Sequence, residues 1–382
     1  MKAKRKVKKN EPDFLILIAT TALVFIGIIM VYSASWPEGM VRFSNGGHYA
    51  NRHIFWAIVG FSGMIVMMNI DYKVWKRFAP YIYILAIILG LLIFSPMGLE
   101  LKGASRWINL GFTTFMPSDA IKLGSIIFFA SFLANKKDKV RNLLNGALPA
   151  FFYIGLSSAL IYLQKDLGTM IVMAGTMIAM FFVSGMHLSL IAGIGAFGYF
   201  FFQYAINSEG NEYRLRRVLI FQDPFQDKLG DGWQLVQSLY ALGSGGVLGV
   251  GLGQSRQKFF YIPESYNDFI FSIIGEELGL IGALFILLLY TILIYRGVMT
   301  ALNAKDLFGS YLATGITALI TIQSFVNIAV ITSSIPATGI TLPLISFGGT
   351  SLVFVMAGIG ILLNISRHGI RKERSVQDES NS

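Results

Sequence analysis

The sequence predicts an all-α integral membrane protein with about ten transmembrane helices. Of its 382 residues, 54% are hydrophobic and only 14% are charged, and the mean hydropathy is +0.62. Several apolar runs reach the roughly 17–25 residues that a helix needs to cross the hydrocarbon core of a bilayer. The 40 glycines and 10 prolines also fit transmembrane helices, which tolerate both residues better than helices of water-soluble proteins do.

The apolar runs follow one another with short polar connections, so residues 14–366 are expected to form a single polytopic membrane domain. Residues 1–13 are a basic tail before it, and residues 367–382 are a second tail after it. The first apolar run is longer than the 7–15 residues of a secretory signal core, which favours an uncleaved anchor over a cleaved signal peptide. The expected spans are Phe14–Ala34, Ile54–Ile70, Pro80–Pro96, Pro117–Asn135, Leu143–Leu163, Leu167–Ser184, Leu188–Asn207, Asp268–Tyr295, Leu307–Ser333 and Ser346–Ser366.

The basic residues predict which side of the membrane each connection faces. With ten spans and a cytoplasmic amino terminus, the inside segments collect about 19 Lys and Arg residues, against 5 in the short outside loops. Short cytoplasmic loops carry such an excess of positive charge. Both termini are therefore expected in the cytoplasm, with one long extracytoplasmic loop, residues 208–266, between helices 7 and 8.

Composition also narrows the classes of function. The net charge of +10 could suggest nucleic acid, but the charges lie mostly at the ends of apolar runs, as topology signals do. The absence of cysteine excludes disulfides and cysteine-ligated metal sites. The cytoplasmic loops lack the Gly-rich Lys-Ser/Thr loop that binds nucleotide phosphates. Chemistry on the outer face would have to proceed without ATP.

The segment from Lys258 to Leu280 is the leading candidate for a functional site. Its first residues are basic and aromatic, and Pro263-Glu264 predicts a turn. The eighth span follows, and its first ten residues include Asp268, Glu276 and Glu277. Carboxylates at the end of a membrane span cost free energy, because their charge must be kept solvated or paired, so their presence indicates a function. From Asp268 to Tyr295 a helix would be roughly 42 Å long, so its first turns are expected to project into a water-filled cavity. We predict that Asp268 is a catalytic base, whereas Glu276 and Glu277 could equally serve as helix-to-helix ion pairs.

Two outer segments that precede the long loop add further candidates. Arg106-Trp107 could anchor the chain at the membrane interface. Equally, the tryptophan could stack on a sugar while the arginine binds a phosphate. Asp119 and Lys122, three residues apart at a helix start, can pair on one helix face, in a structural or a functional role. Asp166 lies in a very short turn between two spans, where it could cap the next helix or face a central cavity.

Two later segments complete the candidate site. Arg214 and Lys258 could offset pyrophosphate charge, or bind anionic lipid headgroups. The Gly-rich run 243–253 does not have the spacing of a dinucleotide fingerprint and more plausibly permits close backbone approach. Between the ninth and tenth spans, Pro336–Gly339 and Ser346–Ser351, which include Gly348 and Gly349, interrupt the apolar pattern. Non-helical backbone of this kind is tolerated at membrane depth only where protein buries it or where it lines a water-filled cavity.

No metal site emerges from the sequence, because the four histidines are scattered without ligand spacing. No cofactor is required by the pattern, although a divalent cation (Mg or Mn) remains an option beside a pyrophosphate.

Taken together, these motifs resemble one family, the SEDS proteins (shape, elongation, division and sporulation) of the RodA/FtsW/SpoVE group. The segment G-L-G-Q-S-R-Q-K is more similar to the FtsW/SpoVE branch than to RodA. The matching pieces, in order, are G-A-S-R-W-I, P-S-D-A-I-K, Q-K-D-L-G-T, Q-S-L-Y-A-L-G-S-G-G, G-L-G-Q-S-R-Q-K, P-E-S-Y-N-D-F-I-F-S-I-I-G-E-E-L-G and P-A-T-G-I-T-L-P-L-I-S-F-G-G-T-S.

The resemblance implies a multi-pass cell-membrane glycosyltransferase that polymerises lipid II into peptidoglycan strands on the outer face, for cell division or sporulation. It also implies a class B penicillin-binding protein as partner, together with other division or sporulation membrane proteins, and it places the family's essential aspartate at Asp268. The substrate-binding residues expected around it are Arg106, Trp107, Asp119, Lys122, Asp166, Arg214, Lys258, Glu264, Ser346, Gly348 and Gly349.

The chain departs from the family pattern at three places. Asp119 stands where the family usually has Glu, Lys165 where it has Pro, and Tyr266-Asn267 where it has His-Thr. The first keeps the charge, the second adds a cation beside Asp166, and the third changes the neighbours of Asp268 without removing it.

Two other classes of function fit part of the pattern. A flippase for the lipid-linked precursor would also show intramembrane charges and broken helices. It would be favoured by inverted repeats, of which none is evident. A structural scaffold of the division machinery predicts that carboxylate substitutions leave growth unaffected.

Overall fold

The computed structural model describes residues 11–369 except 102–103, 110, 112, 187, 208–211, 228–229 and 231, and it is mostly helical. Each of the ten expected spans coincides with a long helix over most of its length. The α-helices are α1 (Phe14–Phe43), α2 (His48–Asn69), α3 (Tyr72–Leu91), α4 (Pro117–Lys136), α5 (Leu148–Leu163), α6 (Leu167–Val183), α7 (Leu188–Asn207), α8 (Glu212–Gln222), α9 (Trp233–Gly245), α10 (Ile270–Leu302), α11 (Leu307–Ile331) and α12 (Thr350–His368).

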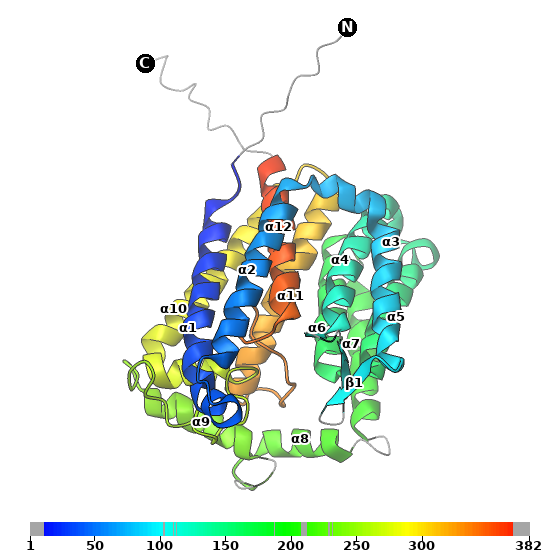
Figure 1. Ribbon diagram of the computed structural model, residues 1–382. Helices are drawn as coiled ribbons and strands as arrows, with labels where there is room; N and C mark the ends of the chain where they lie inside the picture. Colours follow the sequence, from blue (N-terminus) through cyan, green and yellow to red (C-terminus); the bar gives the residue numbers. More distant parts are fainter. Residues whose placement is uncertain are drawn as a thin grey trace, which may run out of the picture.

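The beginning of α1 and the end of α12 lie at the same end of the helix bundle (Figure 1). The backbone N–H of Asp13 donates a hydrogen bond to Ser366 Oγ at 3.1 Å, and the guanidinium of Arg296 pairs with the Asp13 carboxylate. At the same end, the N–H of Tyr72 donates to Asn364 Oδ1 at 2.9 Å. An even number of passes through the bundle produces this arrangement.

Seven helical segments within the described residues are long and apolar enough to cross a membrane. This composition identifies an integral membrane protein. Helix α6 is apolar but only 17 residues long. The seven segments are Phe14–Phe43, Tyr72–Phe94, Pro117–Lys136, Leu143–Leu163, Ile270–Leu302, Leu307–Ile331 and Thr350–His368.

The expectation of an all-α chain was wrong in one place. Between α3 and α4 the chain forms a three-stranded antiparallel sheet, β1 (Gly98–Leu101), β2 (Ala104–Asn109) and β3 (Thr114–Phe115), in the order β1-β2-β3. Gly98 pairs with Ile108, and Ile108 in turn pairs with Phe115. These strands are too short for a clear period-2 pattern, so only the pairing of their backbones reveals them.

The expectation of one continuous helix from Asp268 was also wrong, because α10 is broken at Gly279. Gly279 has φ 66° and ψ −166°, which is not helical, and the helix itself starts at Ile270, two residues after Asp268. The freed carbonyls of Glu276 and Glu277 accept hydrogen bonds from the N–H groups of Val250 and Gly251, at 3.0 and 3.1 Å. The Gly-rich run after α9 therefore replaces the helix's own hydrogen bonds at the break.

Close backbone approach explains the glycines of this region. A Cβ on Gly245 would lie 2.0 Å from the carbonyl oxygen of Gly275, whereas a Cβ on Gly243, in the same helix α9, would meet nothing within 4 Å. Real Cβ atoms do not approach backbone oxygen so closely, so α9 packs against α10 only because residue 245 has no side chain.

The substitution Gly245→Ala should therefore lower thermal stability, and Gly243→Ala should not. Overpacking of this kind costs about 1–3 kcal/mol, whereas an exposed Gly→Ala change inside a helix is neutral or stabilising. Melting of the two purified variants in one detergent provides the measurement. Equal melting temperatures would contradict the tight α9–α10 contact.

Candidate active site

Asp268 lies in an irregular turn just before α10, and α10 begins at the end of the bundle opposite the beginning of α1 and the end of α12 (Figure 1). Its side chain is half-buried, and a Cβ on Gly339 would be 3.4 Å from its Oδ2. Gly339 has φ +72°, a conformation that favours glycine. The carboxylate thus faces the broken segment between α11 and α12.

Hydrogen bonds from side chains hold the turn of Asp268 against that broken segment. The amide nitrogen of Asn327, on α11, donates to the carbonyl oxygens of both Asp268 and Ile340, each at 2.7 Å. Ser346 Oγ donates to the carbonyl of Asn267 at 2.7 Å and accepts from the N–H of Leu342 at 2.8 Å. The backbone around the carboxylate is therefore fixed on both sides.

The small sheet brings a cation to the same region. Arg106 on β2 donates through Nη2 to the carbonyl oxygen of Lys165 at 2.9 Å, and its Nε lies 3.6 Å from Asp166 Oδ2. Asp166 is 2% exposed and caps α6 by accepting from the N–H and hydroxyl of Thr169. The capping role of Asp166 is confirmed, and its carboxylate also lies beside Arg106, whereas its exposure to a central cavity stays a prediction.

The surroundings of Asp268 include charges that raise its pKa and charges that lower it. Burial is the largest effect and raises the pKa of Asp268 to about 6. The negative charge of Glu264 raises this pKa further, as that of Asp166 does, whereas the guanidinium groups of Arg106 and Arg217 lower it. A carboxylate whose pKa lies near the working pH is suited to accept a proton.

Arg217 is a contributor that the sequence did not single out. It lies on α8, which crosses the end of the bundle (Figure 1), and its Nη1 donates to the carbonyl oxygen of Ala337 at 3.0 Å. The side chain of Arg214, selected from the same basic run, lies outside the described part of the structure. Asn327 was also missed, since an amide in an apolar helix has no distinctive local pattern.

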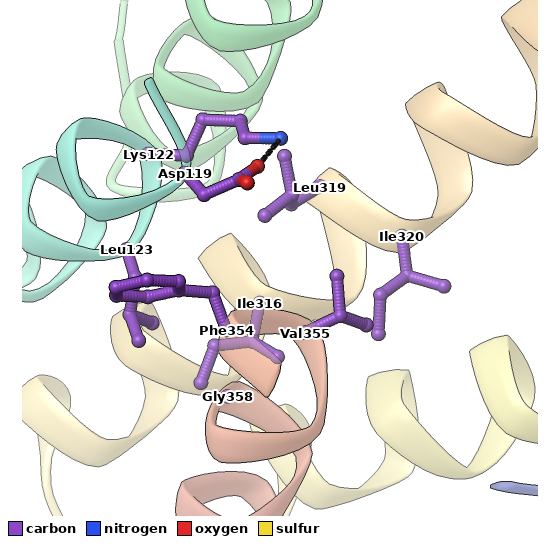
Figure 2. Close-up of a pocket in the computed structure, with 9 residues that line it drawn as sticks. All are labelled: Asp119, Lys122, Leu123, Ile316, Leu319, Ile320, Phe354, Val355 and Gly358. Carbon is purple, nitrogen blue, oxygen red and sulfur yellow. Dashed lines mark ion pairs between the residues drawn. The ribbon is translucent and has the colours of Figure 1, made fainter. Parts of the chain in front are cut away.

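Asp119 and Lys122 form a buried ion pair in a separate pocket, as their spacing predicted. Lys122 Nζ lies 2.8 Å from Asp119 Oδ1, and Figure 2 shows the pair at the edge of a pocket with otherwise apolar walls. The pocket is small, with a volume of about 10 Å³, which is the space that one water molecule needs. Asp119 Oδ2 has no hydrogen-bond partner among the described residues. The apolar lining comes from α4, α11 and α12: Leu123, Ile316, Leu319, Ile320, Phe354, Val355 and Gly358.

Lys258 occupies a structural position. Its Nζ donates to Ser33 Oγ at 3.1 Å, to the carbonyl oxygen of Gly253 at 2.7 Å and to Glu277 Oε1 at 2.9 Å. All three ammonium hydrogens thus have protein acceptors, which leaves none for the pyrophosphate contact suggested by the sequence. Glu276 accepts from the Ser255 hydroxyl and from the N–H of Arg256. Both glutamates are buried and bind the loop to α10 instead of facing a water-filled cavity.

The remaining candidates lie around these groups. Trp107 follows Arg106 on β2, opposite Leu99 of β1. Glu264 has φ +49° and accepts from Asn267 Nδ2 at 3.3 Å. Gly348 and Gly349 precede α12, whose amino-terminal cap is Gly349, with φ 46° and ψ −109°.

The described residues contain no group of three or more His, Asp or Glu side chains arranged to hold a metal ion.

Comparison with known proteins gives a consistent match over almost the whole chain. A family model described as a cell cycle protein, FtsW/RodA/SpoVE, matches residues 13–370. Stage V sporulation protein E of Bacillus subtilis is 42% identical over 362 residues, 94% of this chain and 98% of that protein. A probable peptidoglycan glycosyltransferase FtsW of Trichlorobacter lovleyi is 41% identical and covers 93% of both chains.

Solved structures agree with this match. A chain from a peptidoglycan synthase complex that coordinates polymerization and crosslinking is 26% identical, with a TM-score of 0.76 over 93% of this chain and 98% of that chain. The rod shape determining protein RodA of Thermus thermophilus, 24% identical, has the same fold with a TM-score of 0.69 over 94% and 98%. The resemblance drawn from the motifs is confirmed.

The Lys258–Glu277 pair should stabilise the fold. Removing one partner of a buried ion pair costs about 3–5 kcal/mol because the other charge is left buried alone. We expect Lys258→Met to lower the melting temperature strongly, and the double substitution Lys258→Met with Glu277→Leu to recover most of the loss. Thermal denaturation of the three proteins in detergent measures both effects.

The matched control is Arg42→Met, which removes a partner from the Arg42–Glu38 pair, where the arginine side chain is 58% exposed. Glu38 is 11% exposed, but solvent around the arginine weakens this pair relative to Lys258–Glu277, so Arg42→Met should lower the melting temperature less than Lys258→Met. A double variant no more stable than Lys258→Met would show that Lys258 does not act through Glu277.

Proposed function

The chain belongs to the FtsW/RodA/SpoVE family of cell cycle proteins, and on that premise we propose that it is a peptidoglycan glycosyltransferase. It polymerises lipid II, the undecaprenyl-pyrophosphate-linked disaccharide-pentapeptide, into glycan strands for cell division or sporulation. The observation that carries the proposal is the setting of Asp268. Burial raises the pKa of this carboxylate to about 6, and its backbone is clamped by Asn327.

The reaction requires one proton acceptor and a means to offset a leaving pyrophosphate. Asp268 takes the proton from the 4-hydroxyl of the acceptor sugar, and that oxygen forms a bond to C1 of the donor sugar. The bond between C1 and the pyrophosphate oxygen breaks, so the configuration at C1 inverts and undecaprenyl pyrophosphate leaves. Arg106 and Arg217, whose charges reach Asp268, are placed to offset the developing negative charge.

The lipid nature of the substrate fits the two-part arrangement of the candidate residues. Asp268 with Arg106, Asp166 and Glu264 forms the polar part. Asp119 and Lys122 line a small, otherwise apolar pocket apart from that polar part, and they remain candidate substrate contacts.

The reaction is assigned to the outer face of the cell membrane. The end of the bundle that holds both described chain ends also holds the basic connections near Lys73 and Arg141, and an excess of positive charge marks the cytoplasmic side. Ten spans with both termini inside would put Asp268 on the outer side, which supports this assignment. A class B penicillin-binding protein is the proposed membrane partner, since crosslinking must follow polymerisation.

Removal of the Asp268 carboxylate should abolish polymerisation. Loss of a general base typically reduces rate by about 10²–10⁴, so Asp268→Ala and Asp268→Asn should form no detectable glycan strands from lipid II in proteoliposomes. The control is Asp223→Asn, a carboxylate between α8 and α9 that caps a local turn. Normal polymerisation by the Asp268 variants would contradict the proposed role. Assays with and without the partner measure its contribution.

The pH dependence of the wild type should report the ionisation of Asp268. Only the ionised carboxylate accepts a proton, and its pKa is about 6. We expect kcat/KM to be half-maximal near this pH and to fall about tenfold for each unit below it. A flat profile between pH 5 and 8 would argue against a carboxylate base at this position.

Stability gives an independent check, because a raised pKa means that the fold disfavours the ionised form. The cost appears as pH rises above the usual aspartate value of 3.8 and is complete above about 6. Asp268→Asn removes that cost, so the variant should be more stable than wild type at pH 7.5, by about 1–3 kcal/mol. The difference should vanish near pH 4. An inactive but more stable variant would separate catalysis from folding.

A further inference from the structure

The loop after α9 exposes a run of apolar side chains. Val247, Leu248, Val250 and Leu252 are 61%, 78%, 44% and 55% exposed. No charged residue occurs anywhere from Trp233 to Ser255. Four large apolar side chains in a six-residue stretch would be unfavourable in contact with water, since each costs about 1.5–3 kcal/mol when left exposed.

The backbone of this stretch is suited to an apolar environment. The N–H groups of Val250 and Gly251 donate to carbonyls of α10, and the N–H of Gly249 donates to Gly245 at 2.8 Å. In return, the carbonyl oxygens of Gly246 and Val247 accept from the N–H groups of Leu280 and Ile281, at 2.9 and 3.2 Å. Irregular backbone can lie at membrane depth only when its polar groups are satisfied in this way.

Two helices place the stretch below the membrane surface. The Asp13–Arg296 ion pair marks one edge of the apolar zone, because α1 has no charge from Phe14 to Ser33 and α10 none from Leu278 to Tyr295. At 1.5 Å per residue, Leu280 is only about 24 Å from Arg296. The hydrocarbon core is about 30 Å thick, so the level of Leu280 and Ile281, to which the stretch is bonded, falls inside it.

Helix α1 gives the same depth independently. Ser33, which donates to Glu277 at 2.7 Å, lies 20 residues from Asp13, or about 30 Å along the helix. Ser33, Glu277 and Lys258 therefore mark the opposite edge of the hydrocarbon core, and Leu280 lies nearly one turn inside it. Helix tilt would shorten these distances along the membrane normal and place the stretch deeper.

We propose that Val247–Leu252 forms an apolar lip inserted among the lipid acyl chains of the leaflet at the Asp268 end. The occupant is lipid because the lip continues the lipid-facing surface of α10, where Leu280, Ile281 and Leu284 are each more than half exposed. Beside the break at Gly279, the lip thus covers the part of α10 where the helical surface is interrupted. Its insertion does not depend on the reaction assigned above.

Aromatic residues beyond the lip match the position of a membrane interface. Phe259, Phe260 and Tyr261 are about half exposed, and Trp233 stacks on Tyr261 with ring centroids 6.2 Å apart. Tryptophan and tyrosine are enriched where the hydrocarbon meets the headgroups. The chain from the lip to these rings therefore rises from the acyl region to the headgroup region.

The absence of native cysteine permits a direct test with single labelled cysteines. We would attach a nitroxide to Leu248→Cys and, separately, to Leu252→Cys, in full-length protein reconstituted at one copy per phosphatidylcholine–phosphatidylglycerol nanodisc. The collision rates of each label with oxygen and with a neutral nickel chelate report lipid and water contact. Leu284→Cys on α10 is the lipid-facing control, and Gln226→Cys, exposed between α8 and α9, is the aqueous control.

Both lip labels should behave like the Leu284→Cys label, with oxygen collisions several-fold more frequent than nickel collisions. Nickel accessibility equal to that of Gln226→Cys would overturn the proposal by placing the lip in water. Protection from both reagents would also overturn it, because protein would then cover the lip. Since Leu248 is the most exposed of these side chains, its substitution should leave the melting temperature unchanged, which checks that the labelled protein is folded.

Discussion

The need to satisfy every backbone polar group at membrane depth governs this structure. In hydrocarbon an unpaired N–H or C=O costs several kcal/mol, yet the chain is non-helical there both at Gly279 and between α11 and α12. At Gly279 the Gly-rich run after α9 supplies the missing donors and acceptors. Between α11 and α12, Asn327 and Ser346 do so through their side chains. The second of these repairs also holds the Asp268 turn, because Asn327 donates to the carbonyl oxygen of Asp268 and Ser346 to that of Asn267.

Buried charges divide into two groups with different physical roles. Glu277 and Lys258 are paired, deeply buried and saturated with hydrogen bonds, so they hold the loop on α10 and α1. Asp268 is only half-buried, and the hydrogen bonds that fix it go to its backbone. Its carboxylate therefore remains available to exchange a proton. The difference between the glutamates and Asp268 arises from their partners, since all three are acids at the start of one apolar segment.

Much of the architecture was predictable because a membrane imposes long apolar runs and short polar connections. The helices followed from these runs, whereas the catalytic role of Asp268 stays a prediction. The three-stranded sheet was not predictable, because its strands are as short as two residues and their pairing is non-local. The role of Lys258 was misjudged for a related reason. Its partners Ser33 and Glu277 lie 225 and 19 residues away, and no local pattern connects them.

The sequence by itself determined the class of protein, the helical spans and the family, since each depends on residue types and spacings along the chain. Tertiary structure alone decided which polar residues surround Asp268. Arg106, Arg217 and Asn327 come from a strand, a crossing helix and a long helix that meet only in the folded bundle. It also decided where α10 breaks, because a glycine becomes a break only when another segment supplies hydrogen bonds to the backbone it releases.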